Sequence, residues 1–144
     1  MSRIELKSLR KEFGSTVAVK SLDLQIEDGE FLVLVGPSGC GKTTTLRMLA
    51  GFEDPSDGEI TMDGSIVNDL EPRDRDIGMV FQSHALFPHK SIYDNIEFGL
   101  RMKNVPEAER RKAVEDVAAM VHITPLLNKR PAQCSGGESQ RVAL

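Results

Sequence analysis

The sequence predicts an α/β fold in which a glycine-rich loop connects a buried strand to a helix. The apolar run 31–35 (FLVLV) is typical of a strand buried on both faces, as in a parallel sheet covered by helices. The loop 36–42 follows it directly, and the apolar spacing over 43–50 predicts a helix after the loop. From Ser91 onward the spacing turns helical again, so a β-rich first part precedes a helical second part.

Other short patterns complete the β-rich part. The alternation of apolar and polar residues over 22–26 predicts a strand with one buried face, and a turn signal at 28–29 follows it. The stretch 60–67 predicts a hairpin that turns at the Asp-Gly pair 63–64. A second apolar run, 77–81 (IGMVF), is expected to be a core strand.

The helices are expected to begin and end at recognisable residues. One begins after Ser91, and Pro106 suits the first turn of the next; prolines 125 and 131 punctuate the loop that follows. The sequence ends at Leu144 within what is expected to be the start of another helix. In the helix 43–50 the core-facing residues would be Leu46, Leu49 and Ala50, with Gly51 as its stop. After Pro106 they would be Val114, Val117, Ala118 and Val121.

The composition is that of a globular protein, because 40% of the 144 residues are hydrophobic and 28% are charged. The net charge of −4 argues against a protein that holds nucleic acid on a broad basic surface, so we expect no nucleic-acid partner. The short basic run 110–112 is interpreted as the solvated face of a helix.

The sequence carries no clear signal for membrane insertion, secretion or disulfide bonding. No apolar run approaches the ~20 residues of a membrane helix, and the N-terminus has no apolar stretch suited to a secretion signal. We therefore expect any membrane association to come through a partner. The two cysteines, Cys40 and Cys134, have neither zinc-site spacing nor the pattern of a disulfide framework, which fits a reducing cytosol.

The stretch 36–43 (GPSGCGKT) matches the phosphate-loop pattern G-x-x-x-x-G-K-[ST]. Its glycines allow several backbone N–H groups to point at one phosphate, and the helix that follows adds its N-terminal dipole. Lys42 would reach the β- and γ-phosphates, and the Thr43 hydroxyl would hold Mg²⁺. The thiol of Cys40 is either a small filler or a reactive group activated by the helix N-terminus. The pattern predicts a nucleotide-phosphate site.

A second candidate site lies at Ser135–Glu138 (SGGE). Serine followed three residues later by glutamate is typical of a capping box at a helix start. The adjacent glycines would also let an anionic ligand approach the backbone at that helix N-terminus. On these residues alone, capping and anion binding both stay open.

Three stretches, GPSGCGKTT, MVFQSHALFPH and CSGGESQRVAL, in this order and spacing, closely resemble the ATP-binding subunits of ABC transporters. More narrowly, 71–100 resembles bacterial importers of sugars and related solutes, of the maltose and glycerol-phosphate type. The resemblance implies a P-loop NTPase core with an antiparallel β subdomain and a helical subdomain, C-terminally truncated. It divides the chain into a β-rich core with Walker A and the Q-loop (about 1–82), a helical subdomain (about 83–135), and the signature motif with the start of its helix (134–144).

The resemblance also implies roles for individual residues. Phe13 would stack on adenine, although a core position is the alternative, and Gln82 of the Q-loop would contact Mg²⁺ and the attacking water. Lys42 and Gln82 would serve catalysis, and Thr43 and Gln82 the metal. The Walker A residues around ATP would be Gly36, Ser38, Gly39, Cys40, Gly41, Lys42, Thr43 and Thr44. The signature residues Ser135, Gly136, Gly137 and Glu138 would complete the ATP site of the opposite subunit in a head-to-tail dimer.

The implied function is an ATPase subunit that uses ATP and Mg²⁺ to power solute import. It would lie in the cytoplasm, peripheral on the inner face of the cell membrane, with transmembrane permease subunits docking near 86–88 and a second ATPase subunit as partner. Cys134 stands where leucine is usual and Glu138 where glutamine is common. Family members continue into a Walker B strand, a catalytic glutamate and a switch histidine, which we do not find here. The alternatives are a truncated chain that binds nucleotide without hydrolysis, a non-transport P-loop ATPase, and a P-loop kinase or GTPase.

Overall fold

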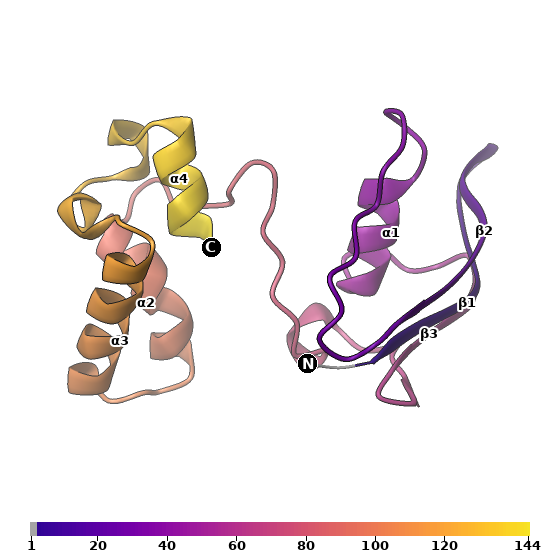
Figure 1. The fold of residues 1–144 in the computed structure, drawn as a ribbon, viewed down its shortest axis with the longest axis horizontal. Helices are drawn as coiled ribbons and strands as arrows, with labels where there is room; N and C mark the ends of the chain where they lie inside the picture. Colours follow the sequence, from indigo (N-terminus) through magenta and orange to yellow (C-terminus); the bar gives the residue numbers. More distant parts are fainter. Residues whose placement is uncertain (1–2) are drawn as a thin grey trace. The chain divides into compact units, whose positions relative to one another are not determined.

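The computed structural model describes residues 3–144. They form two compact units, which divide between Met79 and Val80 (Figure 1). Each unit has its own hydrophobic core. Gln82 lies in the second unit. Among the described residues, no helix has the length and apolar character needed to cross a membrane.

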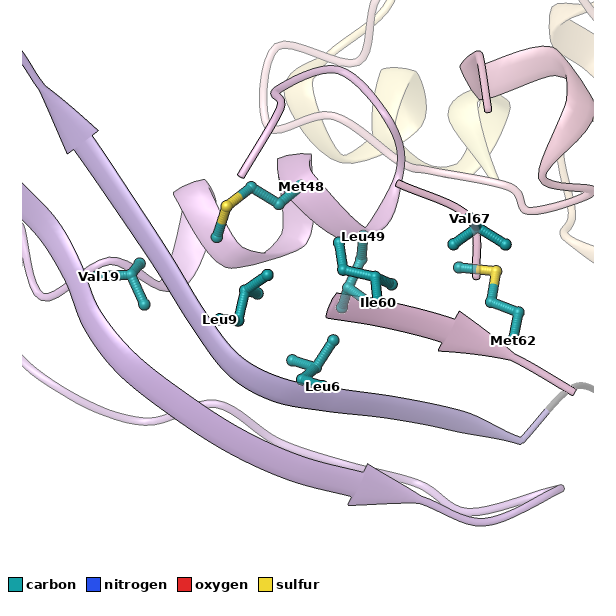
Figure 2. Close-up of a cluster of buried hydrophobic side chains, with 8 residues drawn as sticks. All are labelled: Leu6, Leu9, Val19, Met48, Leu49, Ile60, Met62 and Val67. Carbon is teal, nitrogen blue, oxygen red and sulfur yellow. The ribbon is translucent and has the colours of Figure 1, made fainter. Parts of the chain in front are cut away.

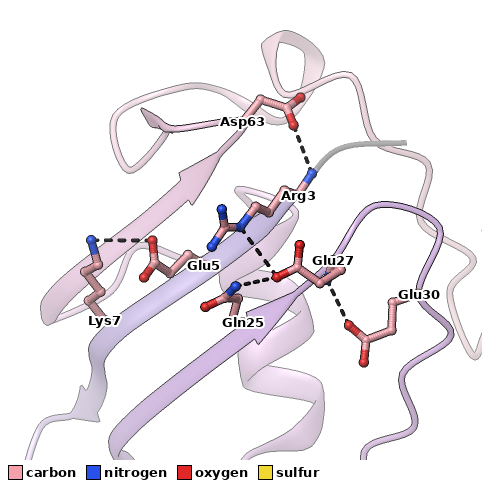
Figure 3. A network of polar contacts seen from close by, with 7 residues as sticks. All are labelled: Arg3, Glu5, Lys7, Gln25, Glu27, Glu30 and Asp63. Atoms are coloured by element: carbon pink, nitrogen blue, oxygen red, sulfur yellow. Dashed lines mark hydrogen bonds and ion pairs between the residues drawn. The ribbon is translucent and has the colours of Figure 1, made fainter.

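The first unit contains an antiparallel sheet with the strand order β2-β1-β3-β4. Polar contacts secure one end of this sheet (Figure 3): the Arg3 N–H donates to Asp63 at 2.9 Å, and the Glu27 N–H donates to Glu30 at 2.8 Å. The hairpin expected at 60–67 is confirmed, with its turn at 63–64. The strands are β1 Ile4–Phe13, β2 Thr16–Ile26, β3 Asp57–Met62 and β4 Ser65–Ile66.

Helix α1 (Lys42–Leu49) packs on this sheet, with Met48 and Leu49 facing the strands (Figure 2). The expected helix after the loop is therefore confirmed, and Gly51, at φ +75°, follows its end. The prediction that Leu46 is buried was wrong, since it is 47% exposed and lines an apolar groove of about 740 Å³ beside 31–34. The buried core consists of Leu6, Leu9, Val19, Met48, Leu49, Ile60, Met62 and Val67.

The prediction of strands at 31–35 and 77–81 was wrong. Both segments are extended or irregular without strand pairing, and Phe31 and Val35 are 90% and 88% exposed. A strand exists only when its backbone N–H and C=O groups bond to a neighbour, and no strand among the described residues pairs with either run. Apolar composition indicated a buried environment but did not specify a partner strand.

Strand β1 was missed because an irregularity interrupts its alternation. Its register with β3 shifts between Lys7 and Arg10, and Ser8 has a φ of +47°. Leu6 and Leu9 are therefore both buried although they are three residues apart. A bulge of this kind inserts a residue and destroys the period of two on which strand prediction relies.

The second unit is helical, as predicted from Ser91 onward. It contains α2 (Ile92–Met102), α3 (Glu107–Met120) and α4 (Gly136–Ala143), with single 3₁₀ turns at Thr124–Leu126 and Pro131–Gln133 in the predicted loop; a further 3₁₀ turn, Pro72–Asp74, belongs to the first unit. Pro106 lies at the N-cap of α3, one residue before its expected place in the first turn. The core residues are Ile92, Ala118, Ile123, Leu126 and Val142.

Two expectations about α3 need correction. The buried face of α3 is narrow: Val114 and Ala118 are buried, but Val117 is 41% exposed. In the basic run, Arg110 is not purely solvated: its Nε donates to Glu97 Oε1 at 2.8 Å and its Nη1 to the Val105 carbonyl at 2.6 Å. A long side chain can reach back from a helix surface to buried acceptors, which charge patterning alone does not reveal.

Candidate nucleotide-binding site

Two glycines shape the loop that precedes α1. Gly39 and Gly41 have φ values of +82° and +92°, which only glycine adopts readily. A Cβ at Gly41 would also lie 2.6 Å from the Ala18 carbonyl oxygen of β2. The loop therefore turns tightly against the sheet and brings its backbone to the start of α1.

The Lys42 ammonium lies inside this loop. Its Nζ donates to the carbonyl oxygens of Gly36 and Pro37, both at 2.7 Å, and lies 3.4 Å from the Cys40 sulfur. The thiol of Cys40 is exposed. One positive charge is thus held within the loop, in contact with neutral acceptors, where an anionic ligand can use it.

The N-terminus of α1 is capped differently from those of α2 and α4. At the start of α2, the Ser91 hydroxyl accepts a hydrogen bond from the Asp94 N–H, and the Asp94 carboxylate accepts one from the Ser91 N–H. Ser135 and Glu138 make the same pair of bonds at the start of α4. In the described chain no side chain caps α1, whose N-cap is Gly41 and whose first turn holds no acidic residue. Its first N–H groups therefore remain available, and such groups together with the helix dipole favour a bound anion.

A cavity of about 620 Å³ adjoins the loop. Lys20 of β2, Lys42 and Thr45 line it, and the Thr45 hydroxyl donates to the Gly41 carbonyl at 2.9 Å. Thr45 was not singled out from the sequence, where it looks like any polar helical position. Loop, helix start and cavity together can bind a phosphate group.

Phe13, the candidate for base stacking, ends β1 and is 48% exposed, so it is a surface residue. The Lys11 ammonium lies 4.9 Å from the centre of its ring and 2.7 Å from a Glu53 carboxylate oxygen. The ring is thereby supported from β1 and the 52–56 loop. Phe13 does not line the cavity beside Lys42.

In the second unit, Gln82 is exposed on a turn that the His84 N–H closes by donating to the Phe81 carbonyl at 2.8 Å. The ring Nε2 of His84 lies 3.3 Å from the Gly136 carbonyl oxygen at the start of α4. Because a carbonyl only accepts, this contact is a hydrogen bond when Nε2 carries the proton. The turn at Gln82 and the start of α4 are therefore neighbours.

The capping box predicted at Ser135–Glu138 is confirmed. The Ser135 N–H donates to the Glu138 carboxylate at 2.7 Å, and the Glu138 N–H donates to the Ser135 hydroxyl at 3.3 Å. The first of these bonds is the main reason that the pKa of Glu138 is lowered, and the bond with the Ser135 side chain adds to it. Gly136 and Gly137 are exposed with open space around them.

The start of α4 is expected to fray in acid. Because the pKa of Glu138 is lower in the folded chain than in the unfolded chain, its contribution to stability is present at neutral pH and is lost as the pH falls through the folded value. Glu138→Gln, whose amide oxygen can still accept from Ser135, should remove this dependence. Hydrogen exchange at the Ser139 amide between about pH 7 and about pH 3 measures it; equal pH dependence in both proteins would contradict the assignment.

The chain's relationship to known proteins agrees with this geometry. The family model described as ABC transporter matches residues 19–144, a span that includes the loop, Gln82 and the capping box. The chain belongs to the ABC transporter family. As a member, it shares the family's α/β P-loop fold, and its family binds ATP.

Among curated relatives of this ABC transporter family member, the trehalose/maltose import ATP-binding protein MalK of Thermococcus litoralis is 50% identical over 150 residues. The sn-glycerol-3-phosphate import ATP-binding protein UgpC of Bordetella avium is 48% identical, and the osmoprotective compounds uptake ATP-binding protein GgtA of Synechocystis is 51% identical. Each match covers 100% of this chain and 40% of the relative, so the chain spans well under half the length of these proteins.

Solved structures give the same family. A post-hydrolysis dimer of the ATP-binding cassette MJ0796, bound to ADP and Pi, matches with a TM-score of 0.87 at 34% identity over 97% of this chain and 66% of that one. Another dimeric structure of MJ0796, described as a bacterial ABC transporter cassette, matches with a TM-score of 0.88 at 35% identity.

Proposed function

We propose that this chain is part of the ATP-binding subunit of an ABC importer and that it binds the phosphates of ATP at the loop 36–44. The observation that carries the proposal is the start of α1: free first-turn N–H groups, no carboxylate cap, and the Lys42 ammonium held beside them. The starts of α2 and α4 hold their own carboxylates in capping boxes, and the uncapped start of α3 carries Glu107 and Glu109 in its first turn. Among the described helices, α1 is therefore the one whose start is suited to an external anion.

Within that site, Lys42 neutralises the phosphates and the backbone around Gly39 and Gly41 surrounds them. The Thr43 hydroxyl, exposed beside Lys42, has the oxygen chemistry that Mg²⁺ prefers. The side-chain amide of Gln82, which belongs to the second unit, carries an oxygen of the same kind. The exposed ring of Phe13 offers a face for the base. ATP supplies the phosphoryl group that is transferred to water.

The exposed glycines beside Ser135 support a role for the signature segment in a second subunit's ATP site, because another chain can approach their backbone closely. The Glu138 carboxylate is already bonded to the Ser135 N–H and to the Ser135 side chain, so the open backbone at Gly136 and Gly137 is what this segment offers to a phosphate. A head-to-tail dimer of two such subunits would close around two ATP molecules.

The partners that we propose are a second ATP-binding subunit and transmembrane permease subunits at the cytoplasmic face of the membrane. The relatives named for import of trehalose and maltose, glycerol phosphate and osmoprotective compounds support sugars and related polar solutes as the transported class. The half-exposed Phe87, which packs its ring against Phe98 at a centroid distance of 4.8 Å, supports a docking surface at 86–88.

Purification of the tagged protein from its native host tests this function. We expect a polytopic membrane protein to copurify and the reconstituted complex to take up solute with ATP. Gln82→Ala should lower solute uptake per ATP hydrolysed about fivefold or more while ATP affinity stays within about twofold, because Gln82 lies on a turn that contacts the start of α4.

The control is Ser83→Ala, which changes the neighbouring exposed residue on the same turn. It should retain normal uptake. A protein that copurifies with no membrane subunit, or a Gln82→Ala complex that transports as efficiently as the Ser83→Ala control, would contradict the proposal.

A further inference from the structure

Arg75 is a buried cation whose hydrogen bonds all go to backbone carbonyl groups. Only 5% of the surface of this residue is exposed to solvent. Nη1 donates to the carbonyl oxygens of Met48 at 2.7 Å and Leu49 at 3.0 Å, which are the last two residues of α1. Nε donates to Leu70 at 2.9 Å, and Nη2 donates to Asn68 at 3.0 Å.

Burial lowers the pKa of Arg75, and the nearby Asp54 partly offsets this effect. An arginine is still charged at neutral pH, so the fold keeps a positive charge at the C-terminal end of α1. That end of a helix carries partial negative charge and unpaired carbonyls, which a cation with several donors satisfies. Gly51 makes room for it, since a Cβ there would lie 2.8 Å from Arg75 Nε.

The segment that Arg75 joins to α1 is itself fixed to the sheet. The Asn68 side chain accepts from the Ile60 N–H at 2.8 Å and donates to the Gly58 carbonyl at 2.9 Å, both in β3. A continuous chain of hydrogen bonds therefore runs from β3 through Asn68 and Arg75 to the end of α1.

An eight-residue helix is unstable by itself, so its placement depends on contacts at both ends. The start of α1 rests on β2 through Gly41 and carries Lys42 and Thr43. We infer that Arg75 is a positioning residue for the phosphate loop: by fixing the far end of α1 to the sheet, it sets where the helix start presents Lys42 and its free N–H groups.

This inference rests on the proposed function, since one of its measurable consequences is ATP affinity. The variants are Arg75→Met, which removes every donor at similar length, and Arg75→Lys, which keeps the charge but not the fork of donors. The stability control is Met62→Ala, which removes a buried core side chain of β3 and leaves the carbonyl partners of α1 unchanged.

Two readouts are taken on the full chain, well below the unfolding midpoint of each variant. Calorimetry should show ATP binding weakened roughly tenfold in Arg75→Met and by less in Arg75→Lys, because small displacements of a binding group have large effects. Without nucleotide, hydrogen exchange at the Thr45 and Leu46 amides should be faster in both Arg75 variants. Met62→Ala should change neither quantity by more than about twofold.

The inference would be overturned if exchange at these amides and ATP affinity are both unchanged in the Arg75 variants. It would also be overturned if Met62→Ala changes both quantities as much as the Arg75 variants do. Where Arg75→Met does not fold, Arg75→Lys decides. A wild-type chain that binds no ATP contradicts the proposed function, and the exchange readout then decides the role of Arg75 separately.

Discussion

Lys42→Ala is expected to weaken ATP binding about tenfold or more and to leave the fold intact. The ammonium makes its hydrogen bonds within the exposed loop and not in the core, so the sheet does not depend on it. A charge-assisted hydrogen bond contributes ~1.5–3 kcal/mol, and about 1.4 kcal/mol corresponds to a factor of ten in affinity. Isothermal calorimetry with Mg-ATP measures the change.

The matched control is Lys20→Ala, which removes the same charge from the same cavity but from β2 instead of the loop. It should weaken ATP binding only slightly, because water and salt screen the attraction between an exposed charge and phosphates that it does not contact. If both variants lose the same affinity, the effect reflects general electrostatic attraction and not a phosphate site at the start of α1.

Gly58→Ala is expected to destabilise the first unit by about 3 kcal/mol or more. Gly58 has a φ of +89°, and an added Cβ would lie 2.5 Å from the Ser8 carbonyl oxygen and 2.7 Å from the Leu9 Cα. The left-handed conformation costs an alanine ~1–2 kcal/mol, and forcing backbone atoms apart adds ~1–3 kcal/mol. Urea unfolding followed at the amide signals of β1 and β3 measures the loss.

Gly64→Ala separates the two causes. Gly64 has a similar φ of +80°, but a Cβ there would meet nothing within 4 Å. This variant should lose only the conformational part, about 1–2 kcal/mol. Equal destabilisation by both variants would mean that β1 does not press on Gly58 as the structure describes.

Features with local causes could be predicted from the sequence. The phosphate-loop pattern, the helix after it, the hairpin at 60–67 and the capping box at Ser135–Glu138 each depend on residues a few positions apart. Glycine conformations, serine caps and helical spacing act at that range, so a single sequence reveals them.

Features that depend on distant partners could not be predicted. The apolar run 31–35 has strand composition, yet a strand needs a neighbour that composition does not name. The bulge at Ser8 hid β1 by breaking its alternation. Arg75 looked like one more charge in a polar segment, because the carbonyls that it binds lie up to 27 residues away in the sequence.

The most direct test of the central claim, that ATP binds by its phosphates at the start of α1, is a map of amide chemical shifts in the labelled chain titrated with Mg-ATP. We predict saturable shifts that are largest at Gly39, Gly41, Lys42, Thr43 and Thr44, and their loss at the same ATP concentrations in Lys42→Ala. A folded chain whose shifts lie elsewhere, or do not change with ATP, would contradict the account.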